Sequence, residues 1–276
     1  MSSQYVPNAR VRSLVFPTSA DASRHAALMV ERLIRENNSA GRPTVLGLAT
    51  GSTPVGLYRE LIRLHKEEDL DLSAVVTFNL DEYYPIPGDD PHSYRRWMNE
   101  TFFQQVNIDP DNIHIPDGTI DKDDVEDYCQ RYEMSIRKAG GIDIQILGIG
   151  RTGHIGFNEP GSTRNSRTRL VTLDPVTRRD AAGDFFGEEN VPQQAITMGV
   201  GTIMEARKVV LMAFGEHKAP IVLKAVEQPQ SEAISASFLQ DHPDATILLD
   251  EAGAGELTLF RRPWEVTAVD WTPDRI

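Results

Sequence analysis

The segment AVVTFNL, residues 74–80, is a continuous apolar run rather than an alternating one. Such a run is typical of a strand that is covered on both faces of a sheet. It ends abruptly at Asp81 and Glu82, so we expect two carboxylates at the carboxyl end of a buried strand. The segment therefore favours a parallel sheet with helices on both faces.

Similar runs recur on both sides of this segment and alternate with helical patterns. We predict further strands at residues 12–16, 44–49, 142–149, 209–214 and 245–250. We predict helices after Ser19 as N-cap, from Pro54 to about Glu67, over residues 93–105 and 122–139, and from near Lys218. This alternation predicts an α/β fold with a mostly parallel, doubly wound sheet in a single domain, residues 1–276. Residues 253–276, with Trp264 and Trp271, show no pattern of a regular element.

The composition limits the classes of partner. The 276 residues carry a formal net charge of −13 with a pI near 5.0, which argues against nucleic acid or an anionic membrane as a partner. The single cysteine, Cys129, cannot form an intramolecular disulfide, and the amino-terminal residues contain no apolar signal segment. We therefore expect a cytoplasmic protein.

Ligands of open α/β sheets bind outside the carboxyl ends of the strands, so the loops at those ends are the candidate sites. The loop Thr50, Gly51, Ser52 and Thr53 joins a strand to a helix. Its hydroxyl groups and the unpaired N–H groups of the helix favour an anion, which predicts a phosphate site. The alternative is an ordinary turn with a Ser or Thr helix cap. No Gly-Lys-Ser/Thr follows, so a nucleotide-binding P-loop is excluded.

Asp81 and Glu82 are the candidate general bases. A carboxylate at a buried strand end is partly desolvated, which raises its pKa toward the range useful for removing a proton beside a carbonyl group. The alternative is an acidic residue that caps a turn or a helix.

The segment GIGRTGHIGFNEP, residues 148–160, carries the most chemistry. Its glycines permit close approach of the backbone, and His154 and Glu159 lie five residues apart in one loop. A histidine paired with a carboxylate can move protons near neutral pH, whereas His25, His65 and His92 lack such neighbours and are interpreted as structural. No His, Cys or carboxylate cluster has the spacing of metal ligands, so we expect no metal and no cofactor.

Lys218 follows the predicted strand at 209–214 and is a candidate phosphate ligand. The alternative is a solvated surface lysine.

Five segments together resemble the glucosamine-6-phosphate deaminase/isomerase family: LATGSTPVGLY (48–58), FNLDEYY (78–84), HSYRRWMNETFF (92–103), LGIGRTGHIGFNEPGS (147–162) and ITMGVGTIMEA (196–206). The resemblance extends from about residue 44 to residue 250 and implies an α/β sheet of modified Rossmann type. It favours the phosphate-site and general-base interpretations over their alternatives.

The resemblance also implies roles for individual residues. Asp81 would move the proton between C2 and C1 of an open-chain amino-sugar phosphate, and His154 would assist ring opening with the support of Glu159. Residues implied to bind substrate or phosphate are Thr50, Gly51, Ser52, Thr53, Lys218, Glu82, Gly150, Thr152 and Gly153. The product would be a ketose phosphate, with release of ammonia.

Three positions depart from the family pattern. Thr152 stands where relatives have an aspartate, and its hydroxyl can orient the imidazole of His154 but cannot neutralise it. Asp184 stands where relatives place a phosphate-binding arginine, for which Arg164, Arg178 or Arg179 are candidate substitutes. Among the implied allosteric positions, Ser162 and Arg169 match, whereas Val171 replaces a lysine.

Two other functions remain open at this stage. Hydrolysis of 6-phosphogluconolactone on a related fold needs the same kinds of group, although its resemblance to the segments at 78–84 and 156–162 is weaker. A non-catalytic sugar-phosphate sensor is the other alternative, but no DNA-binding segment accompanies the fold. The sequence leaves open whether the chain is a monomer or a homo-oligomer.

Overall fold

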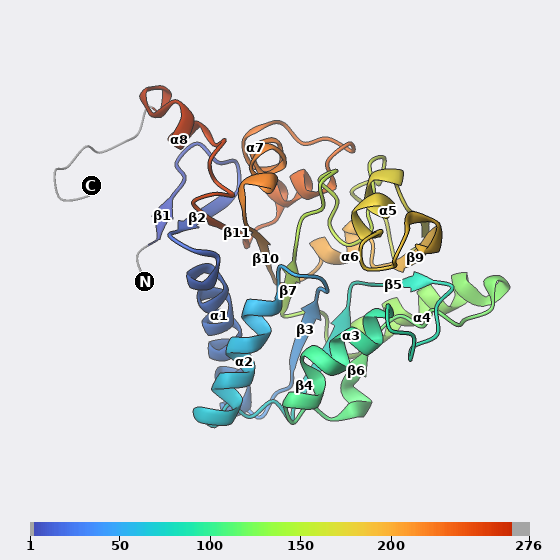
Figure 1. The fold of residues 1–276 in the computed structure, drawn as a ribbon. Coiled ribbons are helices and arrows are strands. Elements are labelled where there is room, and N and C mark those ends of the chain that lie inside the picture. The colour runs from blue at the N-terminus through green and yellow to red at the C-terminus, as the bar shows by residue number, and fades with distance from the viewer. Residues whose placement is uncertain (1–2, 267–276) are drawn as a thin grey trace.

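A computed structural model describes residues 3–266 and shows a central sheet of eight strands between two layers of helices (Figure 1). The strand order is β1-β2-β11-β10-β7-β3-β4-β6, and every neighbouring pair is parallel except β1 with β2. The strands are β1 (Gln4–Tyr5), β2 (Arg12–Phe16), β3 (Thr44–Leu48), β4 (Val75–Asn79), β6 (Ile113–His114), β7 (Ile144–Leu147), β10 (Lys208–Ala213) and β11 (Ala245–Asp250). The predicted α/β class and mostly parallel sheet are confirmed.

The helices bury their apolar sides against the two faces of this sheet. One face is covered by α1 (Ser19–Ser39), α2 (Val55–Glu67) and α3 (Tyr94–Thr101), and the other by α4 (Val125–Lys138), α6 (Val200–Met204) and α7 (Ala219–Glu227). Side chains of consecutive strand residues pack on opposite faces of the sheet. In β3, Val45 packs on the face covered by α4, α6 and α7, and Leu46 on the face covered by α1, α2 and α3. Burial on both faces explains why the strands read as continuous apolar runs.

A second, antiparallel sheet was not predicted. It consists of β5 (Asp81–Tyr84), β9 (Gln194–Thr197) and β8 (Arg169–Thr172), in that order. The main chain changes sheets at Leu80, whose N–H donates to the carbonyl of Leu48 and whose carbonyl accepts from Met198 N. Asp81 and Glu82 therefore lie at the carboxyl end of the buried strand β4, as predicted, and they also begin a new strand, which was not predicted.

Several predicted boundaries also change. Thr18, not Ser19, caps α1, because its side chain accepts from the N–H of Asp21. Predicted helices 93–105 and 122–139 each include a turn of 3₁₀ helix, and Lys218 ends such a turn just before α7. The 3₁₀ segments are Phe103–Gln105, Pro110–Asn112, Lys122–Asp124, Glu188–Asn190, Glu216–Lys218, Ser235–Asp241 and Pro263–Glu265.

The remaining helices are α5 (Pro175–Ala181) and α8 (Thr258–Arg261). The helix α8 lies in the segment from residue 253 onward, where no regular element was predicted; Leu257 is buried at its start. Trp264 is exposed, and Trp271 lies outside the described residues.

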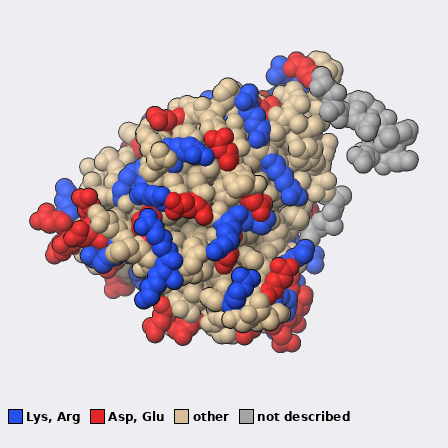
Figure 2. Space-filling view, turned by 180° about the vertical axis from the view of Figure 1, so that it is seen from behind, with Lys and Arg blue, Asp and Glu red and all other residues tan. Residues whose placement is uncertain are grey.

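The surface carries charges of both signs. On the face shown in Figure 2, Lys and Arg side chains are interspersed with Asp and Glu side chains rather than gathered alone. None of the helices within residues 3–266 combines the length and the apolar character needed to cross a bilayer.

Candidate active site

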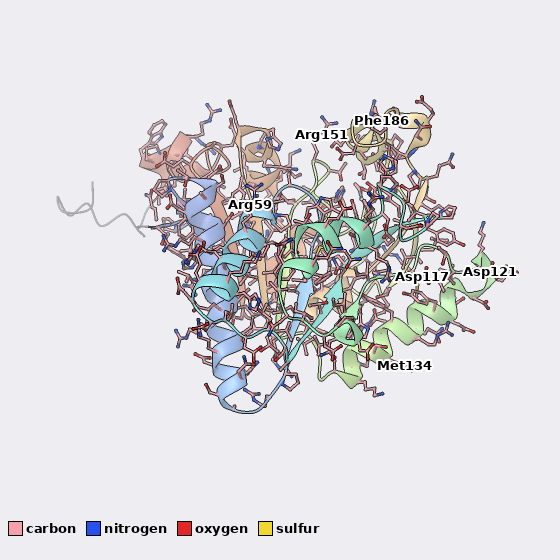
Figure 3. All side chains as sticks on the ribbon, turned by 60° about the horizontal axis from the view of Figure 1, so that its bottom comes forward. Arg59, Asp117, Asp121, Met134, Arg151 and Phe186 are labelled. Carbon is pink, nitrogen blue, oxygen red and sulfur yellow. The ribbon has the colours of Figure 1, made fainter. Side chains whose placement is uncertain are left out.

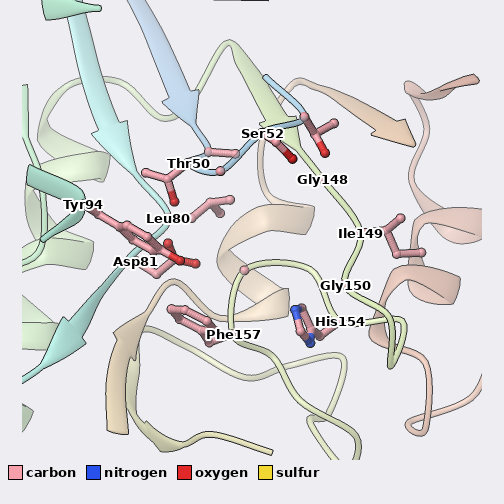
Figure 4. Close-up of a pocket in the computed structure, with 14 residues that line it drawn as sticks. Thr50, Ser52, Leu80, Asp81, Tyr94, Gly148, Ile149, Gly150, His154 and Phe157 are labelled. Atoms are coloured by element: carbon pink, nitrogen blue, oxygen red, sulfur yellow. The ribbon is translucent and has the colours of Figure 1, made fainter. Parts of the chain in front are cut away.

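The strand order places the predicted loops side by side. Strands β7, β3 and β4 are neighbours, and the loops after them enclose a cavity of about 220 Å³ (Figure 4). Asp81 and Tyr94 approach from one side and His154 from another, with Thr50 and Ser52 above them in this view. The lining residues are Ala49, Thr50, Gly51, Ser52, Thr53, Leu80, Asp81, Tyr94, Gly148, Ile149, Gly150, His154, Gly156 and Phe157.

All of residues 50–53 line this cavity. Gly51 has a φ of 88°, a left-handed conformation that glycine adopts without strain. The N-cap position of α2 is Pro54, and no side chain makes a capping hydrogen bond there. The alternative of a Ser or Thr helix cap is therefore excluded.

Asp81 is almost completely buried, with 6% of its surface exposed, yet it reaches the cavity. Burial, and secondarily the neighbouring charge of Glu82, raises the pKa of its carboxyl group to about 8. The backbone of Gly156 lies close by, because a Cβ there would be 3.4 Å from Asp81 Oδ2 and 2.9 Å from Thr197 Oγ1. A carboxyl group with this pKa can take up and return a proton near neutral pH.

Glu82 points away from the cavity. Its carboxylate accepts hydrogen bonds from the backbone N–H groups of Tyr83, Tyr94 and Arg95 and from the hydroxyl group of Ser93. The expectation that Glu82 contacts the substrate is therefore not met, because strand alternation directs it to the amino end of α3.

His154 is held by groups that all converge on its Nδ1 atom. Glu159 Oε2 lies 3.0 Å from this nitrogen, Thr152 Oγ1 2.9 Å and Thr177 Oγ1 3.5 Å. A carboxylate at Nδ1 places the ring proton there, which leaves Nε2 as the proton acceptor. A Cβ at Gly150 would lie 2.0 Å from Nε2, so glycine at this position makes room for the imidazole ring.

Glu159 supplies the negative charge beside His154. Burial alone would raise the pKa of this carboxyl group, but its hydrogen bond and charge interaction with His154, with help from Thr177 and the N–H of Asp174, bring the pKa below its usual value. Glu159 is therefore ionised at neutral pH. Thr152 Oγ1 lies 3.3 Å from Glu159 Oε2, so the hydroxyl joins this pair without adding charge.

Gly153 and Lys218 belong to the surroundings of the cavity. Gly153 has a φ of 88°, and a Cβ there would meet Ile234 at 2.7 Å. Lys218 Nζ donates to the carbonyl of the lining residue Ile149 at 2.8 Å. Burial, together with the charge of Arg151, lowers the pKa of Lys218, and Asp180 opposes this effect. An ammonium group has three donors, so two N–H groups of Lys218 remain for a ligand.

Two of the three arginines considered as substitutes for the missing phosphate ligand have other partners. Arg164 pairs with Asp241 at 3.5 Å, and Arg178 donates to the carbonyl of Glu188 at 2.9 Å. Neither they nor Arg179 are among the residues that line the cavity. Arg151 lies at the surface, where it pairs with Asp180 (Figure 3).

The other two positions that depart from the family pattern, Asp184 and Val171, do not line the cavity. Asp184 is exposed; after it, Phe185 packs against Tyr83 and Phe186 projects into solvent, 86% exposed (Figure 3). Arg169 donates to Ser162 Oγ and to Asn158 Oδ1, both at 2.9 Å, and Val171 lies in the same strand, β8.

Tyr94 and Phe157 line the cavity and were not predicted. Their rings stack with centroids 6.1 Å apart and planes 7° apart. Both lie in segments that carry the family resemblance, and the serine before Tyr94 is a helix N-cap signal. That signal could have placed Tyr94 in the first turn of a helix, although not at the cavity.

The fold and the site define an α/β enzyme with a buried carboxyl group and a carboxylate-paired histidine at the carboxyl edge of a parallel sheet. Among residues 3–266, no group of three or more His, Cys, Asp or Glu is arranged to hold a metal ion. The chain matches the family described as glucosamine-6-phosphate isomerases/6-phosphogluconolactonase over residues 17–248. The chain belongs to this family, and the predicted family resemblance is confirmed.

Curated relatives carry closely related names. The chain is 46% identical over 248 residues to glucosamine-6-phosphate deaminase of Halothermothrix orenii, which covers 90% of this chain and all of that protein. It is 47% identical over 246 residues to the deaminase of Arthrobacter, covering 89% of this chain and 92% of the relative. A putative deaminase-like protein of Bacteroides thetaiotaomicron is 45% identical over 93% of this chain, but the chain spans only 39% of that protein.

Solved structures show the same relationship. A monomeric glucosamine-6-phosphate deaminase superposes with a TM-score of 0.85 at 43% identity, covering 88% of this chain and 99% of that one. The 6-phosphogluconolactonase of Leishmania guyanensis superposes with a TM-score of 0.67 at 23% identity, covering 88% and 97%. The second similarity concerns the fold alone.

Proposed function

We propose that this protein is a glucosamine-6-phosphate deaminase, which converts glucosamine 6-phosphate and water into fructose 6-phosphate and ammonia. The observation that carries the proposal is the placement of Asp81 and His154 around one cavity, with the hydroxyl-bearing loop at residues 50–53 at its edge. The curated relatives that are about 46% identical have this name.

The residues divide the reaction between them. His154, with Nε2 as acceptor and Glu159 behind Nδ1, moves the proton that opens the sugar ring. Asp81 then removes the proton from C2 and returns it to C1, which leaves an imine at C2 that water hydrolyses to the ketone and ammonia. Residues 50–53 and Lys218 bind the phosphate group, which fixes C2 against Asp81.

The decisive experiment is to incubate the purified protein with glucosamine 6-phosphate and to measure ammonia and fructose 6-phosphate separately. Equal amounts of both products are expected. Galactosamine 6-phosphate and mannosamine 6-phosphate test the choice of hexosamine, and 6-phosphogluconolactone tests lactone hydrolysis, which releases acid without ammonia. Binding of sugar phosphates without any turnover would show a sensor and contradict the proposal.

Replacing Lys218 with alanine should raise KM for the phosphorylated substrate by about 10- to 100-fold, because it removes a charge-assisted contact to the phosphate. The change in kcat should be smaller. Steady-state kinetics measure both values, with Lys224→Ala as the control, since Lys224 is an exposed lysine of α7. An unchanged KM in Lys218→Ala would remove this residue from the phosphate site.

Replacing Thr152 with aspartate adds a second carboxylate at Nδ1 of His154, which stabilises the protonated imidazole. A carboxylate there also makes Nε2 a stronger proton acceptor, so kcat/KM for the cyclic substrate, measured by steady-state kinetics, should rise. The gain in kcat/KM should stay below about tenfold, because Glu159 already supplies one carboxylate 3.0 Å away. Thr152→Asn, which has the same shape without the charge, is the matched control. Loss of all activity in Thr152→Asp but not in the parent would assign Thr152 to a different proton path.

A further inference from the structure

Asp81 and Glu82 are consecutive residues of β5, but their carboxylates serve different surroundings. Side chains alternate along a strand, so the two point to opposite faces. Asp81 lines the cavity, whereas Glu82 is 1% exposed and lies against the start of α3. A buried carboxylate beside a second one is costly unless it is well hydrogen-bonded, so the partners of Glu82 determine whether it is stabilised there.

Glu82 links β5 to α3 by hydrogen bonds to both of its carboxylate oxygens. Oε1 accepts from Tyr83 N and Tyr94 N, each at 2.9 Å. Oε2 accepts from Ser93 Oγ at 2.7 Å and from Arg95 N at 2.9 Å. Three of these donors belong to the first turn of α3 and its N-cap, where the unpaired N–H groups of a helix favour a negative charge.

The residue that Glu82 fixes most directly is Tyr94. The phenol ring of Tyr94 lines the cavity beside Asp81 and stacks on Phe157 (Figure 4). Its hydroxyl group donates to Tyr83 Oη at 3.3 Å and is within hydrogen-bonding reach of Thr50. The position of α3 therefore sets one wall of the cavity, and this wall joins the carboxyl group of Asp81 to the loop at residues 50–53.

Glu82 also acts on Asp81 through its charge: burial raises the pKa of Glu82, and its four hydrogen bonds oppose this effect. Burial is the main cause of the raised pKa of Asp81, and the neighbouring Glu82 charge is the second. The other titratable groups near Asp81 are Tyr83 in β5, Tyr94 in α3 and Tyr132 in α4, with His154 from the loop after β7 in the same cavity. Burial raises the pKa of all three phenols, to about 12 for Tyr83, so they stay neutral while the carboxyl groups titrate.

We propose that Glu82 is a positioning residue: without touching the substrate, it holds Tyr94 at the cavity wall and keeps a negative charge behind Asp81. The proposal rests on the proposed function in one respect, since it takes Asp81 as the group that moves the C2 proton. The contacts of Glu82 do not depend on that assignment.

Two variants separate the charge from the shape. Glu82→Gln removes the charge and turns an NH₂ group toward backbone donors. We expect the acid limb of the pH–rate profile, where Asp81 loses its proton, to move to lower pH, and kcat on the plateau to fall by about tenfold. Glu82→Asp keeps the charge but shortens the side chain. Its acid limb should stay in place while kcat falls by about 10- to 100-fold, because a displacement of about 1 Å is costly to catalysis.

A measurement without substrate makes the proposal independent of the activity assay. The ¹³C signal of the Asp81 carboxyl group is assigned by its absence in Asp81→Asn. This signal should titrate at lower pH in Glu82→Gln than in wild type, and at the same pH as wild type in Glu82→Asp. If wild type lacks deaminase activity but this shift is present, the proposed function fails and the role of Glu82 stands. If both variants unfold at lower temperature but show wild-type kcat and an unchanged Asp81 titration, Glu82 is only a structural cap and the proposal is overturned.

Discussion

Replacing Asp81 with asparagine should lower kcat by about 100- to 10,000-fold while the protein still binds the sugar phosphate. The amide keeps the shape of the carboxyl group but cannot accept the C2 proton, and a positioned general base contributes about this much to the rate. Steady-state kinetics, together with exchange of the C2 hydrogen with deuterated water, measure the loss. Near wild-type turnover in this variant would remove Asp81 from the mechanism.

The pH dependence gives the same prediction a second readout. Only the ionised carboxylate accepts a proton, so kcat/KM of the wild-type protein should rise as the pH passes through the Asp81 pKa of about 8. The residual activity of Asp81→Asn should lack this limb. If the wild-type profile shows no such rise near pH 8, the role of Asp81 as base is contradicted.

The same variant should be more stable than wild type in mildly alkaline solution. The folded protein keeps Asp81 protonated up to about pH 8, whereas the unfolded chain ionises it near pH 4. Folding therefore loses stability as the pH rises through this interval, and asparagine avoids the loss. A higher unfolding temperature for Asp81→Asn above about pH 8 would also show that its low activity does not come from misfolding.

Replacing His154 with glutamine should lower kcat/KM for the cyclic substrate by about 100- to 10,000-fold, because the amide cannot accept the proton that opens the ring. The loss should be much smaller for an analogue without the C5 hydroxyl group, which cannot close the pyranose ring. The comparison of the two substrates in one variant isolates ring opening from the later proton transfer.

A matched control for this variant is His65→Gln. His65 lies in α2, and its Nδ1 is 2.7 Å from the carbonyl of Leu70, outside the cavity. This control should retain wild-type activity on both substrates. Equal losses on the cyclic and the 5-deoxy substrate in His154→Gln would assign His154 to the whole reaction rather than to ring opening.

The sequence alone determined the type of fold and the loops that contain the chemistry. Parallel strands buried on both faces must be apolar along their whole length, so residues 74–80 and the similar runs identify strands without any tertiary information. A strand in such a sheet ends where polar side chains begin. Asp81, His154 and residues 50–53 could therefore be singled out in advance, and all of them line the cavity.

The tertiary structure decided how these groups are combined. The sequence contains no signal that the chain changes sheets at Leu80, because that change depends on pairing between Asp81 and Thr197, which are remote in sequence. The pairing turns Asp81 toward the cavity and Glu82 toward α3, two roles that adjacent carboxylates in a sequence do not reveal. Likewise, Tyr94 reaches the cavity because α3 packs on the main sheet, with its amino end hydrogen-bonded to Glu82. Periodicity and motifs are local, whereas strand order and side-chain convergence come from long-range packing, and the cavity is formed by that packing.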